Sequence, residues 1–193
     1  MTNNSTTPSD QCKMNEHLMD KHLEPNSEVV RLLRQWGDGP ENGNSHEIAA
    51  LRQYDEETLK KAIVSIFSSG NAQIRIYAIE AMPYIVSREM MIELLIPCLH
   101  DDRVVIRWKS CKMFQRYADP RATIPLMEVL RKEKNPDIRV AAADALGKIG
   151  NTQAISALTD AIKNDKGKDF EGRTVATMAR GAIAAIKERM KST

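Results

Sequence analysis

The residues able to do acid–base, nucleophilic or metal chemistry are few and scattered along this 193-residue chain. Three of its four histidines lie within the first 46 residues, so no Ser-His-Asp set can be assembled along the rest of the chain. The single His46-Glu47 pair is explained by helix capping, and Cys12, Cys98 and Cys111 form no CxxC pair. The sequence therefore predicts no catalytic residue, no cofactor and no metal site.

One basic segment, residues 103–116, has the residue types that contact nucleic-acid phosphates, with a tryptophan among them. A groove that follows a phosphate backbone should continue from one structural unit to the next. The matching segment further along the chain offers only Arg139 and Lys148. We therefore expect an exposed outer face, and nucleic acid is the less favoured partner. The residues of this possible outer-face contact are Trp108, Lys109, Lys112 and Arg116.

An internal repeat shows which elements must position these side chains. Ile74-Arg75 recurs as Ile106-Arg107 and as Ile138-Arg139, so the step from the first pair to the second equals the step from the second to the third. Small or apolar residues follow each isoleucine at offsets of 4, 7, 8 and 11, which place them on one side of an α-helix. The three stripes are Ile74, Ala78, Ala81, Met82 and Ile85; Ile106, Ser110, Met113, Phe114 and Tyr117; and Ile138, Ala142, Ala145, Leu146 and Ile149.

A second helix follows in every unit, with apolar residues at i, i+3, i+4 and i+7. Turn signals such as Asn135-Pro136-Asp137 separate the helices. Two helices with one apolar stripe each cannot bury their faces alone, but stacked pairs share a continuous core. The predicted fold is all-α, an α-solenoid of about four to five stacked helix pairs with an N-terminal capping helix. The predicted second stripes are Leu59, Ala62, Ile63 and Ile66; Met91, Leu94, Leu95 and Cys98; Thr123, Leu126, Met127 and Leu130; and Ile155, Leu158, Thr159 and Ile162.

The third copy, NPDIRVAAADALGKIG at residues 135–150, resembles the HEAT-like repeat of the phycobilisome-lyase type. The resemblance covers roughly residues 46–190. It implies a structural role for Arg75, Arg107, Asp137 and Arg139, because such residues usually link neighbouring loops in these repeats. It also implies an alternative function, an auxiliary subunit that attaches or removes a bilin chromophore.

Three departures from the repeat carry expectations of their own. Pro83 replaces the Gly147 of the third copy and should bend its helix, and Pro97 has a similar late position. Arg173 continues the arginine series after a slightly longer step. In the last helix a shifted stripe fits better, with a charged end that faces water. That stripe is Val175, Met178, Ala179, Ala182, Ile183 and Ile186.

The chain divides into a polar tail over 1–27, a capping helix and loop over 28–45, and the repeats over 46–193. Val29, Leu32, Leu33 and Trp36 form the apolar side of the capping helix, which we expect to dock on the first repeat. The alternative is that this helix docks on a partner. Residues 1–45 carry a net charge of −3 and residues 46–193 carry +5.

The second helices are expected to line the inner, concave surface of the solenoid. Their outward residues are mixed and slightly acidic, and they include the apolar Val64 and Ile96. An apolar patch with a mixed polar rim is typical of a protein–protein site. The predicted protein-binding residues are Glu57, Lys61, Val64, Glu89, Glu93, Ile96, Arg121, Glu128 and Asp160.

These observations favour a non-enzymatic adaptor or scaffold that binds a polypeptide or a helix. The bilin-related role and nucleic-acid binding through residues 103–116 are the alternatives. The sequence has no long apolar stretch, so we expect no membrane partner and a cytoplasmic location. The identity of the partner and the oligomeric state are left open.

Overall fold

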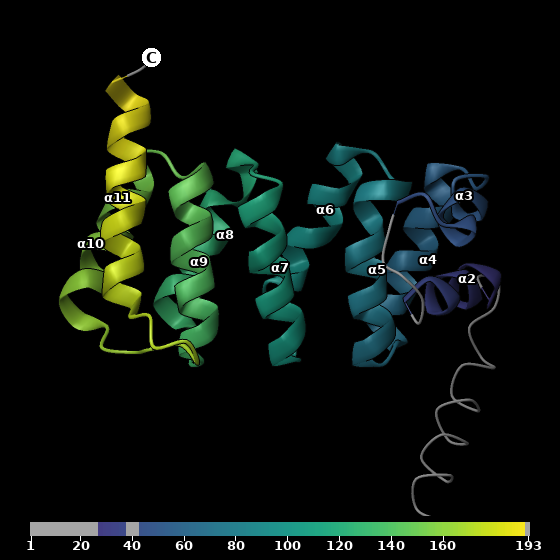
Figure 1. Cartoon of the computed structure of the whole chain (residues 1–193), viewed down its shortest axis with the longest axis horizontal. Helices are drawn as coiled ribbons and strands as arrows, with labels where there is room; N and C mark the ends of the chain where they lie inside the picture. Colours follow the sequence, from purple (N-terminus) through teal and green to yellow (C-terminus); the bar gives the residue numbers. More distant parts are fainter. Residues whose placement is uncertain (1–26, 38–42, 192–193) are drawn as a thin grey trace, which may run out of the picture. The chain divides into compact units, whose positions relative to one another are not determined.

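The computed structural model describes residues 27–37 and 43–191, and these form ten α-helices and one short 3-10 turn. Within this described part no strand occurs, and the single β-bridge pairs Lys168 with Thr174. The all-α prediction is therefore confirmed (Figure 1). The polar tail predicted for residues 1–27 lies outside the described residues apart from Ser27. The chain forms two compact units that meet at the Val86–Ser87 bond, and each is treated by itself.

Unit 1 contains α2 (Ser27–Gly37), α3 (His46–Leu51), α4 (Glu56–Ser69) and α5 (Ala72–Ile85). Polar side chains start three of these helices. Ser45 Oγ accepts from the Ile48 N–H at 3.2 Å, and Asp55 Oδ1 accepts from the Thr58 N–H at 2.8 Å. Asn71 does the same for α5. Each cap satisfies a backbone donor that the first helical turn leaves unpaired.

Helix α2 is the predicted capping helix. Its apolar side is buried, and it packs against α3, α4 and α5. The Trp36 side chain is only 2% exposed, and its ring meets Tyr84 edge-to-face at 6.3 Å between centroids. Because this apolar side is already used inside unit 1, it is not free to dock on a partner, which was the alternative.

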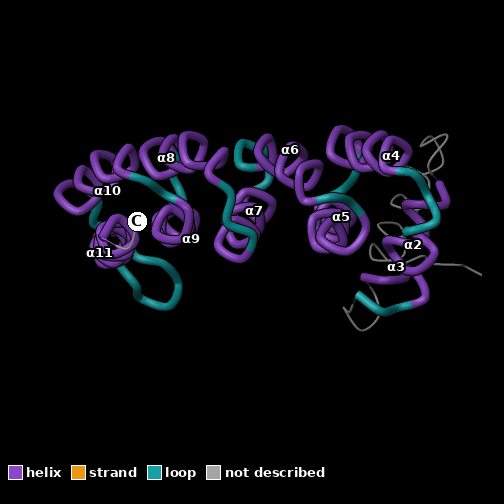
Figure 2. Tube along the Cα trace, turned by 90° about the horizontal axis from the view of Figure 1, so that it is seen from above, coloured by secondary structure: helices purple, strands orange, loops and turns teal. Residues whose placement is uncertain are grey.

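Unit 2 contains three consecutive helix pairs. They are α6 (Arg88–Cys98) with α7 (Val104–Arg116), α8 (Thr123–Lys132) with α9 (Pro136–Ile149), and α10 (Thr152–Asn164) with α11 (Val175–Lys191). A 3-10 turn over Pro120–Ala122 leads into α8. Within this unit α6, α8 and α10 form one row and α7, α9 and α11 form the other (Figure 2). The first row holds the second helices of the repeat, as the periodicity predicts.

The predicted stripes are buried in α4 to α9, with Tyr117 half-buried where α7 ends. The register predicted for α10 is wrong. This helix buries Ala154, Ala157, Leu158 and Ala161, so each position of the stripe lies one residue earlier than predicted. Because α10 packs against both α8 and α11, small alanines take the interface, and the larger isoleucines of the predicted stripe stay half-buried at its edge.

The structure shows what happens at the prolines and in the last helix, where the sequence departs from the repeat. Helix α5 continues through Pro83 and ends two residues later, at Ile85, and α6 ends one residue after Pro97. The shifted stripe of α11 is confirmed, since its residues are buried or half-buried. Arg189 lies in the exposed last turn of α11 and donates to the carbonyl oxygens of Gly147 at 2.7 Å and Gly150 at 2.8 Å. It thereby satisfies acceptors at the end of α9.

Substitutions at two glycines, Gly147 in α9 and Gly181 in α11, can test how closely these two helices pack. A Cβ added at Gly147 would lie 3.0 Å from the Ala182 Cα, whereas a Cβ at Gly181 would meet nothing within 4 Å. We expect Gly181→Ala to raise the free energy of unfolding by about 1 kcal/mol through helix propensity. Gly147→Val should lower it by about 1–3 kcal/mol because the helices must separate. Urea unfolding followed by circular dichroism measures both, and a neutral Gly147→Val would contradict the close contact.

Candidate functional site

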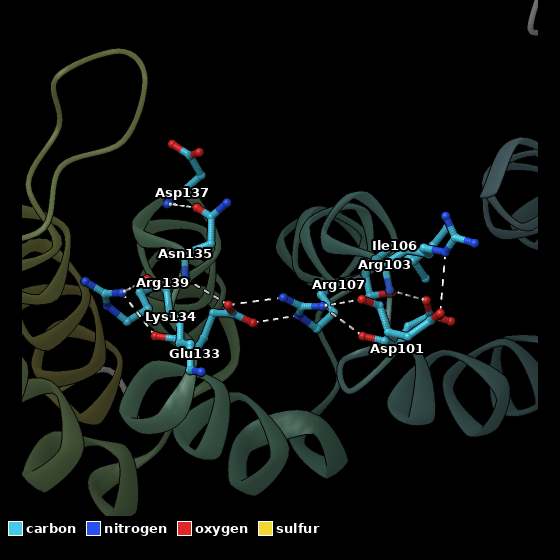
Figure 3. Close-up of polar contacts among 11 residues, drawn as sticks. Asp101, Arg103, Ile106, Arg107, Glu133, Lys134, Asn135, Asp137 and Arg139 are labelled. Carbon is cyan, nitrogen blue, oxygen red and sulfur yellow. Dashed lines mark hydrogen bonds and ion pairs between the residues drawn. The ribbon is translucent and has the colours of Figure 1, made fainter.

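Part-buried arginine–carboxylate pairs tie consecutive repeats of unit 2 together, and Figure 3 shows the first of them, Arg107 with Glu133. Arg107 Nε donates to Glu133 Oε2 at 2.6 Å, and its Nη2 donates to Oε1 at 3.2 Å. Its Nη1 donates to the carbonyl oxygens of Asp101 at 2.9 Å and Asp102 at 3.1 Å. One guanidinium therefore holds the turn before its own helix and the carboxylate that follows the next helix.

Arg139 makes the same arrangement of contacts one repeat later, also within unit 2. Its Nε and Nη2 donate to Asp165 at 2.6 and 2.9 Å, and its Nη1 donates to the carbonyl oxygens of Glu133 and Lys134. The side chains of Arg139 and Asp165 are only 16% and 15% exposed. In unit 1, Arg75 Nε donates to the Gly70 carbonyl, so it also holds the turn before its helix. The structural role implied for these arginines is confirmed.

Both carboxylates are held in the ionised form. The Arg139 hydrogen bonds, opposed by burial, lower the pKa of Asp165. Burial raises the pKa of Glu133, but hydrogen bonds from Arg107 and from the Asn135 N–H lower it by more, so the net shift is downward. Each carboxylate is thus paired with an arginine of the same chain, so these contacts hold the repeats together.

The series does not continue to Arg173. Its Nε donates to Asp169 Oδ2 at 2.7 Å, four residues earlier in the same loop, and Nη1 pairs with Glu171 at 3.1 Å. The loop 165–174 makes the step from Arg139 to Arg173 longer than the step from Arg107 to Arg139. Arg173 consequently precedes α11 instead of lying in its first turn. Arg173 continues the arginine series in the sequence, but its side chain binds within its own loop.

Two hollows lie beside the arginine pairs, on the row formed by α6, α8 and α10. The first lies between α6 and α8 and is lined by His100, Glu128 and Lys132, with Arg107 and Glu133 at one end. The second lies between α8 and α10 and has the same plan one repeat later. It is lined by Arg131, Asp160 and Asn164, with Arg139 and Asp165 at one end. The two hollows are thus related by the same spacing as the sequence repeat.

The predicted binding residues of unit 2 lie on this row. Glu89, Glu93, Arg121 and Asp160 are exposed, and Ile96 and Glu128 are half-buried. Asp160 and Glu128 line successive hollows. Those of unit 1 lie on α4, where Glu57 and Lys61 form an exposed ion pair of 3.5 Å and Val64 is 45% exposed. The two apolar residues of the predicted binding surface belong to different units, Val64 to α4 of unit 1 and Ile96 to α6 of unit 2.

Two features of this surface could not be predicted from the periodicity of the sequence. Ile124 on α8 is 53% exposed, although the equivalent Ile92 is fully buried. Arg121 is also held locally, since its side chain donates twice to Asp119 at 2.9 Å. The hydrogen bonds to Asp119 raise the pKa of Arg121, with smaller contributions from the charges of Glu89 and Glu93. The start of α8 therefore carries an apolar residue beside a positioned guanidinium.

The basic outer face on α7 has a different setting from the one predicted. Arg116 is exposed, but Trp108, Lys109 and Lys112 are half-buried, and both lysine Nζ atoms lie 6.0 Å from the Trp108 ring centroid. Trp108 and Lys112 line a pocket whose other walls carry four carboxylates. Trp108 is thus surrounded by negative as well as positive charge, which weakens the case for a phosphate contact.

Cysteine and metal chemistry find no support among the described residues. Cys98 and Cys111 are buried, and burial raises the pKa of Cys111, so its thiol stays protonated. Within residues 27–37 and 43–191, no three His, Cys, Asp or Glu side chains gather as metal ligands. His46 and Glu47 lie at the start of α3, as capping predicts.

Comparison with known proteins agrees with this architecture. Residues 92–179, which lie within unit 2, match the family model for HEAT repeats. A search of curated proteins finds no match. The match and the paired helices support a HEAT-like repeat protein, a class whose stacked repeats commonly mediate protein interactions. The match does not specify the phycobilisome-lyase type of repeat. In the described part of the chain, no helix combines the length and apolar character needed to cross a membrane.

The arginine pairs predict a large effect of a single substitution. Arg139→Ala leaves the part-buried Asp165 carboxylate without its counter-charge and should lower the free energy of unfolding by about 3 kcal/mol. Arg131→Ala removes an exposed arginine from the same region and should change it by about 0.5 kcal/mol or less. Urea unfolding of both variants provides the measurement. Equal effects would contradict the structural role of Arg139.

The same pair predicts a pH dependence with a defined sign. The folded-state pKa of Asp165 is depressed, so its contribution is present above the unfolded pKa of about 4 and is lost as the pH falls through the folded value. The wild-type protein should therefore lose more unfolding free energy than Asp165→Asn between pH 7 and pH 3. Urea unfolding at both pH values gives the comparison, and identical losses would refute the assignment.

Proposed function

We propose that this protein is a non-enzymatic adaptor or scaffold that binds a polypeptide on the row formed by α6, α8 and α10. The two hollows beside the arginine pairs carry the proposal, because they repeat one plan at the spacing of the repeat. A partner segment laid across these helices meets equivalent depressions in succession. Solenoid proteins use their stacked surfaces in this way.

Each hollow is lined in part by an arginine and a carboxylate that are already paired. Arg107 and Arg139 each bind one carboxylate and two carbonyl oxygens, so the turns at the ends of both hollows are fixed. A surface that is ordered before binding loses less conformational entropy when a partner docks. The same pairs that stabilise the fold thus favour binding at this face.

The charges of this row indicate the chemistry of the partner. At the outward positions that recur from repeat to repeat, the carboxylates outnumber the cations of Arg121 and Lys132. Lys132 also lies 3.8 Å from Glu128, which offsets part of its charge. A segment with basic side chains can pair with these carboxylates and is oriented by them. The four carboxylates at these positions are those of Glu89, Glu93, Glu128 and Asp160.

Apolar contacts supply the remaining affinity. Ile124 is exposed on α8 and Ile96 is half-buried on α6, so a partner can bury both. Val64 gives α4 of unit 1 an exposed apolar residue of its own, which we include as a second contact. Apolar residues with a polar rim fit a protein interface better than a small-molecule site.

The bilin-related role remains a prediction from the repeat resemblance, and nucleic-acid binding remains a prediction from the basic residues of α7. Both differ from the proposal in a measurable way. The first needs a chromophore, and the second needs binding that weakens steeply with salt. Protein binding at the acidic row requires neither.

Charge reversal on the row tests the proposal. The wild-type protein and the variants Glu128→Lys and Asp160→Lys are used to capture proteins from cells of the source organism, with quantitative mass spectrometry. We expect each variant to lose the main partner about tenfold, because like charges then face its basic segment. Glu188→Lys makes the same charge change at an exposed position of α11 and should retain that partner.

Circular dichroism and the unfolding midpoint show whether each variant keeps the wild-type fold. Equal capture by all four folded proteins would contradict binding at this row. Loss only with Glu188→Lys would move the interface to the other row of helices. Capture that disappears with nuclease treatment would replace the proposal with nucleic-acid binding.

A further inference from the structure

A second site lies on the opposite row of unit 2, between α7, α9 and the loop 165–174. This pocket is lined by Trp108 and Lys112 of α7, by Asp137 and Asp144 of α9, and by Phe170 of the loop, together with other loop side chains and Met178 of α11. Its floor is made by small or buried residues of α9. It shares no lining residue with the two hollows of the first row.

The pocket combines two aromatic side chains at its walls. Trp108 is half-buried, while Phe170 is 74% exposed, the most exposed large apolar side chain among those that the structure describes. Solvent exposure of a phenylalanine is unfavourable by roughly 1.5–3 kcal/mol relative to full burial. A group that enters the pocket can cover part of this ring and recover part of that free energy.

The loop that carries Phe170 is held in place. The buried Asp169 carboxylate accepts from the backbone N–H groups of Glu171 at 3.1 Å and Arg173 at 2.8 Å. The Phe170 N–H donates to Asp137 Oδ1 at 2.8 Å, which ties the loop to the start of α9. Gly172 has a φ of 82°, a left-handed conformation that glycine adopts without strain. The aromatic ring is therefore displayed by an ordered loop, which favours binding.

The charges around the pocket are mainly negative. Four carboxylates and two cationic side chains line it. Arg173 is paired with Asp169 and Glu171, and the Asp169 carboxylate is buried. Asp144 is half-buried and makes no hydrogen bond or close ion pair to the residues described, and its charge is only the weakest of those that raise the pKa of Arg173. A carboxylate that lacks a hydrogen-bonded partner beside two aromatic rings is suited to a cation.

We propose that this pocket binds an arginine side chain of a polypeptide partner. The guanidinium lies between Trp108 and Phe170 and has the Asp144 carboxylate as its counter-ion. A planar guanidinium stacks on aromatic rings and pairs with a carboxylate at the same time. Lys109 and Lys112 lie 6.0 Å from the Trp108 ring centroid, at the outer limit of a cation–π contact, so cations already approach this ring.

This site is independent of the row proposed above, so either can fail while the other holds. A partner that uses both would contact two faces of the same unit. The pocket therefore adds a recognition element for one residue type to a surface otherwise described by repeated hollows.

A small cation and its neutral isostere test the pocket directly. We propose to titrate the full chain with N-acetyl-arginine amide, and in parallel with N-acetyl-citrulline amide, while recording amide and indole N–H signals by NMR. The Trp108 indole and the Phe170 amide should shift saturably with arginine, with a dissociation constant on the order of 1 mM or weaker. The Trp36 indole is buried in unit 1 and serves as the internal reference.

Two matched variants locate the charge. Asp144→Asn is nearly isosteric and should raise the half-saturation concentration at least about threefold, because the counter-ion is lost. Glu188→Gln removes a carboxylate from the exposed last turn of α11, outside the pocket lining, and should leave the titration unchanged. Equal shifts with the citrulline amide, an unchanged Asp144→Asn titration, or a Trp108 signal that does not move would each overturn the proposal.

Discussion

The guanidinium that bridges two successive loops is the interaction on which unit 2 depends. Each of Arg107 and Arg139 binds a carboxylate beyond the next helix and the carbonyl oxygens of the turn before its own helix. A repeat protein has contacts only between neighbours, so its stability depends on each interface separately. An isolated buried charge would destabilise such an interface, but here both charges are paired and both arginines are multiply hydrogen-bonded. The interaction therefore sets the register of one repeat on the next as well as its stability.

This constraint explains which parts of the fold could be predicted. The regular recurrence predicts a buried stripe in each copy, and the resemblance to HEAT-like repeats implies a structural role for the arginine that follows each isoleucine. Both occur in α7 and α9. Helix α10 departs from the pattern where it packs against α11, whose apolar stripe is itself shifted from the repeat. Arg173 departs because the loop before α11 binds it locally through Asp169. Periodicity predicts what neighbouring repeats share, but it does not predict how the last repeat closes its loop.

The candidate sites were less predictable for the same physical reason. An exposed position can be read from a helical period, and so Glu128 and Asp160 were found on the correct row. Whether an exposed position lines a hollow depends on the size of the neighbours on the next helix. The surroundings of Trp108 show the limit most clearly. Its lysine neighbours are close in sequence, but the carboxylates that share its pocket come from α9 and from the distant loop before α11. Sequence proximity therefore suggested a purely basic surface where the folded chain makes a mixed one.

The distribution of charge in unit 2 gives the two rows different properties despite the net positive charge of residues 46–193. Arg107 and Arg139 form ion pairs within the fold, and Arg189 hydrogen-bonds to carbonyl oxygens at the end of α9. None of these cations is therefore available to attract a polyanion. Carboxylates remain at the surface beside the hollows of one row and around the aromatic pocket of the other. Net charge alone therefore does not describe the candidate sites, because the fold pairs these arginines internally and leaves carboxylates exposed at both sites. A protein partner with basic side chains can pair with the exposed carboxylates of both rows.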